Sequence, residues 1–423
     1  MLFYSFFSIS WAQTSSVPEV DAQGDQIYCP LSQINIVTNF NITNGSNEIE
    51  AIYVQISEGY VRGEDKLTLQ NPSSHPNISV TAFNNSTGKL ILKWTGTGTT
   101  NYADLIAATK DVIFESSNPQ PSGNRTFSIT IDEKNYLPST GHYYEFISSI
   151  GITWTAAKAA AETKNYNGLQ GYLATITTSE EAQLTGEQAS GAGWIGGSDA
   201  ATEGVWKWVT GPETGKTFWQ GGISGNVTPP FNFAFWNSQE PNQAGNEDYA
   251  HITAPNIGIR GSWNDLSNTG SAFGDYQPKG YIVEYGGMPG DPVLTLSAST
   301  KLSIPSIINT TGKERCGEGT VELKANSNIG EVLWFDSETS TTSIGKGTAF
   351  ITPLISTTKN YYALASSNGC VTGKRSPVVA TIKPIPTIVS KTEDILCENG
   401  SATLTATASA GAPSATCAAL PML

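Results

Sequence analysis

Oxygen-bearing side chains gather in the turn-rich part of the chain between residues 194 and 285. Three short motifs carry most of them, namely Glu-Pro-Asn at 240–242, Asn-Glu-Asp at 246–248 and Trp-Asn-Asp at 263–265. Carboxylate and amide oxygens in a segment without Cys favour Ca²⁺ over zinc or copper. Because several carboxylates cannot be buried together unless a cation neutralises them, the pattern predicts a calcium site. Pro241 is compatible with a rigid turn that contains a cis peptide bond.

Helices and strands are predicted in front of these motifs. An Ala-rich helix is expected over 154–163, with Thr153 as its N-cap. A second helix is expected to begin at Thr178, where Glu181 completes a capping box. Seven of the ten Trp residues fall between positions 154 and 263, in a region rich in Gly, Asn and Pro. Such a long loop region is typical of a binding region, whereas the Trp residues themselves are expected in the core. These core residues are Trp194, Trp206, Trp208 and Trp263.

Residues 137–287 resemble a C-type lectin domain. The two early helices, the sequence Trp-Ile-Gly-Gly at 194–197 and the three motifs follow one another in that family's order. The resemblance implies an α/β fold with long loops, which bind calcium and sugar. Carried over residue by residue, it implies a principal site for both Ca²⁺ and carbohydrate, formed by Glu240, Asn242, Glu247, Asn264 and Asp265. It also implies an auxiliary calcium site, formed by Asp199, Glu203 and Asp248 with Glu247 shared.

The resemblance also implies a sugar class. In the family, two adjacent sugar hydroxyls complete the coordination of the ion and bond to the same side chains, which suits carboxylate acceptors and amide donors. Glu240 before Asn242 implies mannose, glucose or N-acetylglucosamine, whereas Gln before Asp implies galactose. Gln243 stands where the family commonly has an acid or a shorter amide. The domain also departs from the family in having no cysteine, with Tyr249 and Val283 at the usual positions, so packing of Trp and Tyr must compensate.

The segments on either side of this domain predict β-sandwiches. Residues 27–134 contain short alternating strands, and their order resembles the cadherin-like repeats of bacterial surface proteins. Residues 293–384 resemble an Ig-like domain, because Cys316, Trp334 and Cys370 follow the order Cys-Trp-Cys. We expect a Cys316–Cys370 disulfide in an oxidising exterior. Residues 385–423 repeat the start of that domain 81 residues later, and are expected to be the beginning of a truncated second copy.

Length and composition place these units in a multi-domain, mostly β chain, with the central region taken as 135–290. Charged residues make up only 14% of the 423 residues, against about 25% in an average soluble domain. The net charge of −14 argues against nucleic acid as a partner, and no apolar run is long enough to span a membrane. Residues 1–12 are apolar and end in Ser-Trp-Ala, which predicts a clipped signal peptide and a secreted or cell-surface protein.

Three functions remain open from the sequence. The leading hypothesis is a calcium-dependent carbohydrate-binding adhesin that is not an enzyme and recognises mannose-type glycans. The second is a lectin-like module for protein–protein adhesion, in which calcium is purely structural. The third is a hydrolase that uses Glu240 and Asp265 as paired carboxylates, which would require a cleft and separated pKa values.

Overall fold

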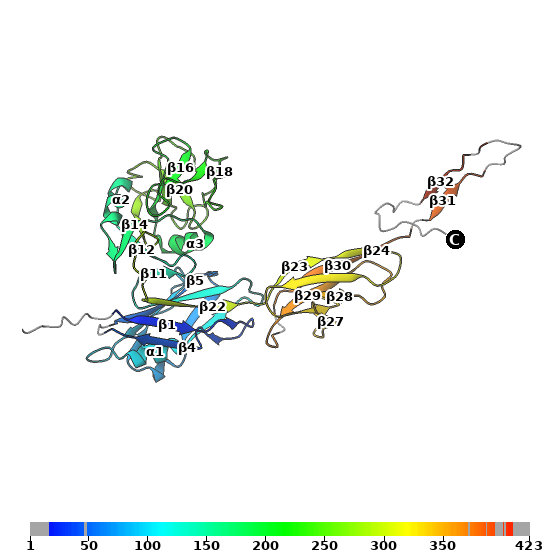
Figure 1. The fold of residues 1–423 in the computed structure, drawn as a ribbon, viewed down its shortest axis with the longest axis horizontal. Helices are drawn as coiled ribbons and strands as arrows, with labels where there is room; N and C mark the ends of the chain where they lie inside the picture. The colour runs from blue at the N-terminus through cyan, green and yellow to red at the C-terminus, as the bar shows by residue number, and fades with distance from the viewer. Residues whose placement is uncertain are drawn as a thin grey trace, which may run out of the picture. The chain divides into compact units, whose positions relative to one another are not determined.

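The computed structural model describes residues 17–45, 49–370, 373–385, 387–393, 401 and 403–408 (Figure 1). The predicted mostly β architecture is confirmed. The predicted signal peptide at 1–12 lies outside the described residues. In the described part of the chain, no helix combines the length and apolar character needed to cross a membrane. The chain divides into two compact units, of which the first holds the chain up to Gln26, Gln33–Ser117 and Asn124–Leu302.

Two larger sheets and one separate pair of strands form the N-terminal part of the first unit. Alternating apolar residues place one face of each strand in the interior, and Phe114 contacts Phe127 across the sheets with ring centroids 5.6 Å apart. The larger sheet has the order β2 (Gln26–Ile27), β22 (Ser297–Ser303), β10 (Arg125–Thr130), β5 (Ala51–Glu58), β8 (Lys89–Trp94) and β7 (Ile78–Val80). The smaller sheet has the order β3 (Ile34–Asn35), β9 (Val112–Ser116) and β6 (Asp65–Leu69), while β1 (Glu19–Gln23) pairs with β4 (Asn39–Thr43). A helix, α1 (Tyr102–Lys110), precedes β9, and a short 3₁₀ turn covers Pro72–Ser74.

Strand β22 corrects the boundary expected for the Ig-like domain at 293. It pairs antiparallel with β10 over six residues, from Thr130 opposite Ser297 to Arg125 opposite Leu302. Thr300 is buried in this position and donates its hydroxyl proton to the carbonyl of Ile36 at 2.6 Å. A Ser/Thr-rich strand carries no signal for which sheet it joins, so its partner could not be predicted from the sequence. The chain between β10 and β22, which contains the central domain, is therefore an insertion between two neighbouring strands of the N-terminal sheet.

The central domain combines two helices with one extended sheet. Helix α2 (Trp154–Glu162) begins at Thr153, whose side chain caps it, and α3 (Ser179–Gln188) begins with the predicted Thr178–Glu181 capping box. The main sheet path is β11 (Asn135–Leu137), β12 (His142–Ser148), β21 (Pro278–Tyr285), β15 (Ala192–Ser198), β16 (Val205–Trp208), β17 (Thr217–Gln220) and β18 (Asn226–Val227). Beside it, β14 (Leu169–Leu173) pairs with β21 and β13 (Asn165–Tyr166), and β19 (Tyr249–Ile252) pairs with β15 and β20 (Trp263–Leu266).

Aromatic packing holds the central domain, which contains no cysteine. The four predicted core tryptophans are at most 1% exposed, which confirms their assignment. Tyr249, at one of the positions where the family has a Cys, stacks on Trp154 with ring centroids 4.6 Å apart. Val283, at another, is fully buried. Stacked and edge-on aromatic pairs contribute about 0.5–1.5 kcal/mol each beyond the area they bury, so the packing partly replaces the missing bridges.

The second unit contains an Ig-like arrangement of two sheets around Trp334. Trp334 is fully buried and stacks on Phe350 with ring centroids 5.3 Å apart. One sheet has the order β23 (Ile307–Thr311), β25 (Glu322–Ser327) and β28 (Ala349–Ile351). The other has the order β24 (Lys313–Cys316), β30 (Ser376–Lys383), β29 (Lys359–Ser366), β26 (Glu331–Phe335) and β27 (Gly345–Lys346). Of the expected truncated repeat, the structure describes a pairing of β31 (Ile388–Lys391) with β32 (Ala406–Ala408), and most of 385–423 lies outside the described residues.

The expected Cys316–Cys370 disulfide is wrong. Cys370 is bonded to Cys29, with their Cα atoms 5.5 Å apart, and Cys316 is disulfide-bonded through a different partner. The residues around Cys29, Ile27–Ser32, belong to the second unit although they are 341 positions away from Cys370 along the chain. The prediction paired Cys370 with a cysteine that is close to it in the sequence. It could not include Cys29, because the position of Cys29 in the second unit depends on tertiary structure.

A buried ion pair joins the two N-terminal sheets and provides a test of their packing. Arg125 on β10 contacts Asp65 on β6 at 2.6 Å, and both side chains are at most 1% exposed. We expect Arg125→Met to lower the free energy of unfolding by about 3–5 kcal/mol, because Asp65 is left as an unpaired buried charge. Lys158→Met, which breaks the exposed Lys158–Glu162 pair, should cost at most about 1 kcal/mol in urea unfolding. Equal losses for the two variants would contradict the assigned role of Arg125.

The revised disulfide pairing can be tested by peptide mapping. A proteolytic digest of unreduced protein should contain one peptide pair joined through Cys29 and Cys370, which separates after reduction. The alternative product to look for by mass spectrometry is a peptide pair that joins Cys316 to Cys370. Its presence as the main species would contradict the pairing in the structure.

Candidate functional site

The predicted ligands lie where three neighbouring strands of the central sheet end or begin. Asp199 follows β15 directly, Asp248 precedes β19, and Asn264 and Asp265 lie on β20. The backbone N–H of Asp199 donates to the carbonyl of Asp248 at 3.2 Å, and Ala250 stands opposite Asp265 in the β19–β20 pair. Strand pairing therefore brings together side chains that are up to 66 positions apart in the sequence.

Asp265 anchors the loop that carries the Glu-Pro-Asn motif. Its two carboxylate oxygens accept the backbone N–H groups of Asn242 at 3.2 Å and Gln243 at 3.0 Å. The Glu240–Pro241 peptide bond is cis, which agrees with the turn expected there, and Pro241 is buried. The loop from residue 240 to residue 243 is therefore held against β20 by the same carboxylate that is predicted to bind the ion.

Gln243 has a role that the sequence analysis did not assign. Its side-chain oxygen accepts the backbone N–H of Glu247 at 2.7 Å, and its amide nitrogen donates to the carboxylate of Glu203. Gln243 thus links the principal set of ligands to the auxiliary set. The backbone φ of Gln243 is 54°, which lies in the left-handed region, and the sequence did not predict this conformation.

Three of the predicted ligands carry a buried acceptor oxygen without a hydrogen-bond partner in the structure. They are Asp199 through Oδ1, Glu240 through Oε2 and Asn264 through Oδ1. Two of these side chains have a hydrogen bond through another atom. Asn264 Nδ2 donates to the carbonyl of Asp265 at 3.1 Å, and Asp199 Oδ2 accepts the backbone N–H of Gly204 at 2.9 Å. A buried oxygen that lacks a donor costs about 1–3 kcal/mol, and more when it is charged, so a cation, a proton or another donor at these atoms would stabilise the site.

Burial and neighbouring carboxylates raise the pKa of three acids of the site. Burial raises the pKa of Glu240 to about 8, with neighbouring Asp265 and Glu247 adding to the effect. Burial likewise raises the pKa of Asp199 to about 6, to which Glu203, Asp248 and Asp265 contribute, and it raises the pKa of Glu247. Like charges in a poorly hydrated site repel one another unless a cation or a proton neutralises them.

The donor set fits a hard cation such as Ca²⁺. All eight predicted side chains offer oxygen, and three of them present the unpartnered buried oxygens described above. In the described residues, however, no three His, Cys, Asp or Glu side chains are grouped as a metal site would require. Two of the five side chains in the principal set are amides, those of Asn242 and Asn264. The carboxylates of Asp265 and Glu247 already accept backbone N–H groups of the loop. The assignment of the eight ligands therefore remains a prediction.

The auxiliary set, like the principal set, combines buried and exposed side chains. Asp199 is buried, but Glu203 is exposed and Asp248 is partly exposed. Asp248 accepts a hydrogen bond from the side-chain amide of Asn246 at 2.6 Å. The two predicted sites share Glu247, and the side chain of Gln243 contacts both sets, so a cation in one would influence the other.

The Ig-like region matches a protein-family model. The model is described as an Ig-like domain, CHU_C associated, and it covers residues 303–384. Its first residue, Ser303, is the last residue of β22, the strand that joins the N-terminal sheet.

Relatives and solved structures are also similar to parts of the chain. Halomucin of Haloquadratum walsbyi is 32% identical over 283 residues, and the C-type lectin domain family 4 member F of Mus musculus is 26% identical over 179 residues. These alignments cover 64% and 40% of this chain, but the chain spans only 3% and 26% of the two relatives. The mouse scavenger receptor C-type lectin carbohydrate-recognition domain aligns with 36% of this chain and 91% of its own, at 22% identity and a TM-score of 0.25. Part of the chain is therefore similar to C-type lectin domains, and residues 303–384 match an Ig-like model, within a mostly β structure.

Proposed function

We propose that the chain is a secreted or cell-surface protein that binds carbohydrate through calcium in its central domain, with a preference for mannose-type glycans. The observation that carries this proposal is the set of unpartnered buried oxygens on Asp199, Glu240 and Asn264, within a cluster of oxygen donors only. The similarity to a C-type lectin family member supports the choice of carbohydrate as the ligand. The similarity to halomucin supports an extracellular location.

The side chains of the principal site would hold both the ion and the sugar. Bound calcium would supply a positive charge and open coordination positions for two adjacent hydroxyl groups of a sugar. Glu240 would accept a hydrogen bond from one hydroxyl, and the amide of Asn242 would donate to the other. Asp265 would keep the loop in place through its bonds to the backbone of Asn242 and Gln243. The carboxylate of Glu240 only accepts hydrogen bonds, whereas the amide of Asn242 can also donate them. The order of the two residues would therefore discriminate between sugars.

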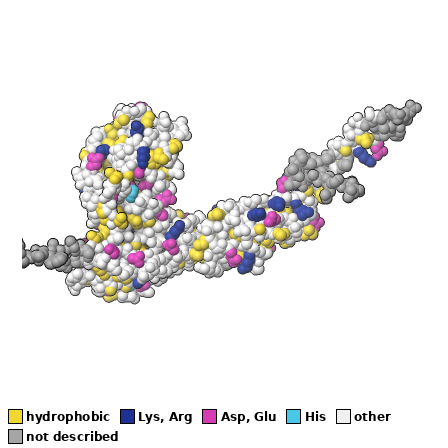
Figure 2. Space-filling model, in the orientation of Figure 1, with side chains coloured by type: hydrophobic (Ala, Val, Ile, Leu, Met, Phe, Trp, Pro, Cys, Tyr) yellow, Lys and Arg dark blue, Asp and Glu magenta, His cyan; other side chains and the backbone are white. Residues whose placement is uncertain are grey.

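The surface of the protein suits a binding role in a polar exterior. On the face visible in Figure 2, charged and hydrophobic side chains are scattered among a majority of uncharged polar side chains and backbone. A sparsely charged surface offers little long-range attraction to charged polymers. Selectivity would therefore come from local sites such as the calcium loops.

The sugar preference is tested by exchanging the two residues that set it. The double variant Glu240→Gln, Asn242→Asp should lose binding to mannose-type glycans and gain binding to galactose in a glycan array. The wild type should bind mannose-type glycans in calcium and lose at least tenfold in affinity in a chelator. Glu162→Gln, which changes an exposed acid on α2, should bind as the wild type does. If the folded protein binds no sugar in calcium, or binds a protein partner and no sugar, the adhesion module with structural calcium is favoured.

Calcium should also stabilise the central domain. At a calcium concentration of about 100 times its Kd, the free energy of unfolding should rise by about 2.7 kcal/mol. Glu240→Gln should remove most of this increment, while raising the stability of the calcium-free protein, because Asp265 and Glu247 then face one carboxylate fewer. Thermal unfolding of both proteins in calcium and in chelator measures both effects. A calcium increment that Glu240→Gln leaves intact would show that the ion binds elsewhere.

A further inference from the structure

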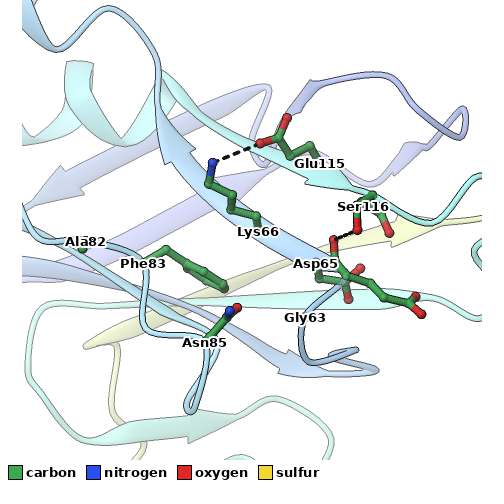
Figure 3. Close-up of a pocket in the computed structure, with 10 residues that line it drawn as sticks. Gly63, Asp65, Lys66, Ala82, Phe83, Asn85, Glu115 and Ser116 are labelled. Atoms are coloured by element: carbon green, nitrogen blue, oxygen red, sulfur yellow. Dashed lines mark hydrogen bonds and ion pairs between the residues drawn. The ribbon is translucent and has the colours of Figure 1, made fainter.

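The N-terminal sheets contain a cavity that plays no part in the calcium site. Its volume is about 590 Å³, and it lies between the first residues of β6, the end of β9 and the loop that connects β7 to β8. Figure 3 shows Phe83 and Asn85 on the loop and, across from them, Asp65, Lys66 and Ser116 on the two strands. Ligand cavities commonly have volumes of about 300–1,000 Å³ and combine apolar surface with a few placed polar groups.

We propose that this cavity binds a segment of neutral oligosaccharide without calcium. The proposal rests on the proposed function only in taking carbohydrate as the ligand class, since its residues and its test are separate. A sugar ring has one face of C–H groups, which can lie on the ring of Phe83, and a rim of hydroxyls that both donate and accept. A cavity that binds sugar must therefore offer both an apolar surface and hydrogen-bonding groups.

The strand side of the cavity is rigid. Asp65 is fixed by its buried pair with Arg125 at 2.6 Å and by the backbone N–H of Val61, which donates to its carboxylate at 2.8 Å. Lys66 contacts Glu115 at 3.4 Å, and Glu115 accepts the side-chain amide of Gln33 at 2.8 Å. A site whose groups are held before the ligand arrives loses less entropy on binding.

The loop side is also held in one geometry. The ring of Phe83 packs edge-on against buried Tyr60 with centroids 6.3 Å apart, and the Tyr60 hydroxyl donates to the carbonyl of Asn85 at 2.8 Å. Arg62 donates to the carbonyl of Ser86 at 2.7 Å, which fastens the next residue of the same loop. Phe83 is therefore a braced, half-buried ring rather than an unsupported surface side chain.

Charge and polarity favour a neutral, hydroxyl-rich ligand over the alternatives. The cavity offers the ammonium of Lys66 as a donor, the carboxylates of Glu64 and Glu115 as acceptors and the side chain of Asn85, which can do both. The lining carries the carboxylates of Glu64, Asp65 and Glu115 against the ammonium of Lys66, so the net charge is negative even when Arg125 is counted, and an anionic polymer would be repelled. Only Ala82 and Phe83 contribute apolar side chains, too few to hold a lipid or the hydrophobic anchor of a peptide.

The test uses the full chain in excess chelator, so that the calcium site makes no contribution. Binding of neutral hexose disaccharides and tetrasaccharides is measured by calorimetry or on an array, alongside sulfated oligosaccharides and a pool of unrelated peptides. We expect weak binding of a neutral oligosaccharide that survives the chelator. Phe83→Ala should weaken it at least tenfold, and Lys66→Met, at an exposed position, should weaken it severalfold. Phe273→Ala, which removes an aromatic ring that is 82% exposed in the central domain, should have no effect.

The result separates this site from the calcium site. Glu240→Gln should leave binding in chelator unchanged, whereas Phe83→Ala should leave the calcium-dependent component unchanged. The proposal is overturned if no neutral oligosaccharide binds in chelator, if binding is insensitive to both Phe83→Ala and Lys66→Met, or if only sulfated sugars or peptides bind. Unfolding midpoints of the variants show whether a loss of binding reflects a loss of the fold, and Lys66→Met remains informative if Phe83→Ala unfolds.

Discussion

Repulsion between carboxylates at the end of β20 is the constraint on which the candidate site depends. Asp265 is 1% exposed and lies beside Glu240 and Glu247, so the fold concentrates negative charge where water screens it poorly. A protein can tolerate such a cluster if a proton or a cation neutralises it. The loop is nevertheless already bonded to Asp265 through two backbone N–H groups. The geometry is thus partly formed by the chain itself, and a cation would complete it.

The scaffold behind this loop must be rigid, because a coordination site tolerates little displacement of its ligands. The central domain achieves this without cysteine, through buried tryptophans and the stack of Tyr249 on Trp154. The predicted capping boundaries fix where the two helices begin. The central domain is connected at its N-terminal end to β10 and at its C-terminal end to β22, and these two strands are neighbours in one sheet. The domain is therefore anchored to that sheet at both ends.

Local sequence patterns predicted the elements well, and tertiary partners poorly. The capping box at Thr178, the buried tryptophans and the cis bond before Pro241 follow from residue types that act on their immediate neighbours. The partner of β22 and the partner of Cys370 depend on segments more than 160 residues away, for which one sequence carries no signal. The link made by Gln243 was missed for a similar reason, because it requires the folded path of the loop.

The two regions that are proposed to bind sugar obtain rigidity in different ways, and this has a consequence for specificity. In the N-terminal sheets, Arg125 neutralises Asp65 within the fold, so the nearby cavity wall is fixed without any added ion. In the central domain, the equivalent positive partner is not supplied by any side chain, which leaves the unpartnered oxygens of Glu240 and Asn264. Binding at the first region would then be constant, whereas binding at the second would follow the calcium concentration of the surroundings. A chain with both could remain attached weakly to a glycan surface and strengthen its hold when calcium is present, because linked sites raise avidity even when each is weak.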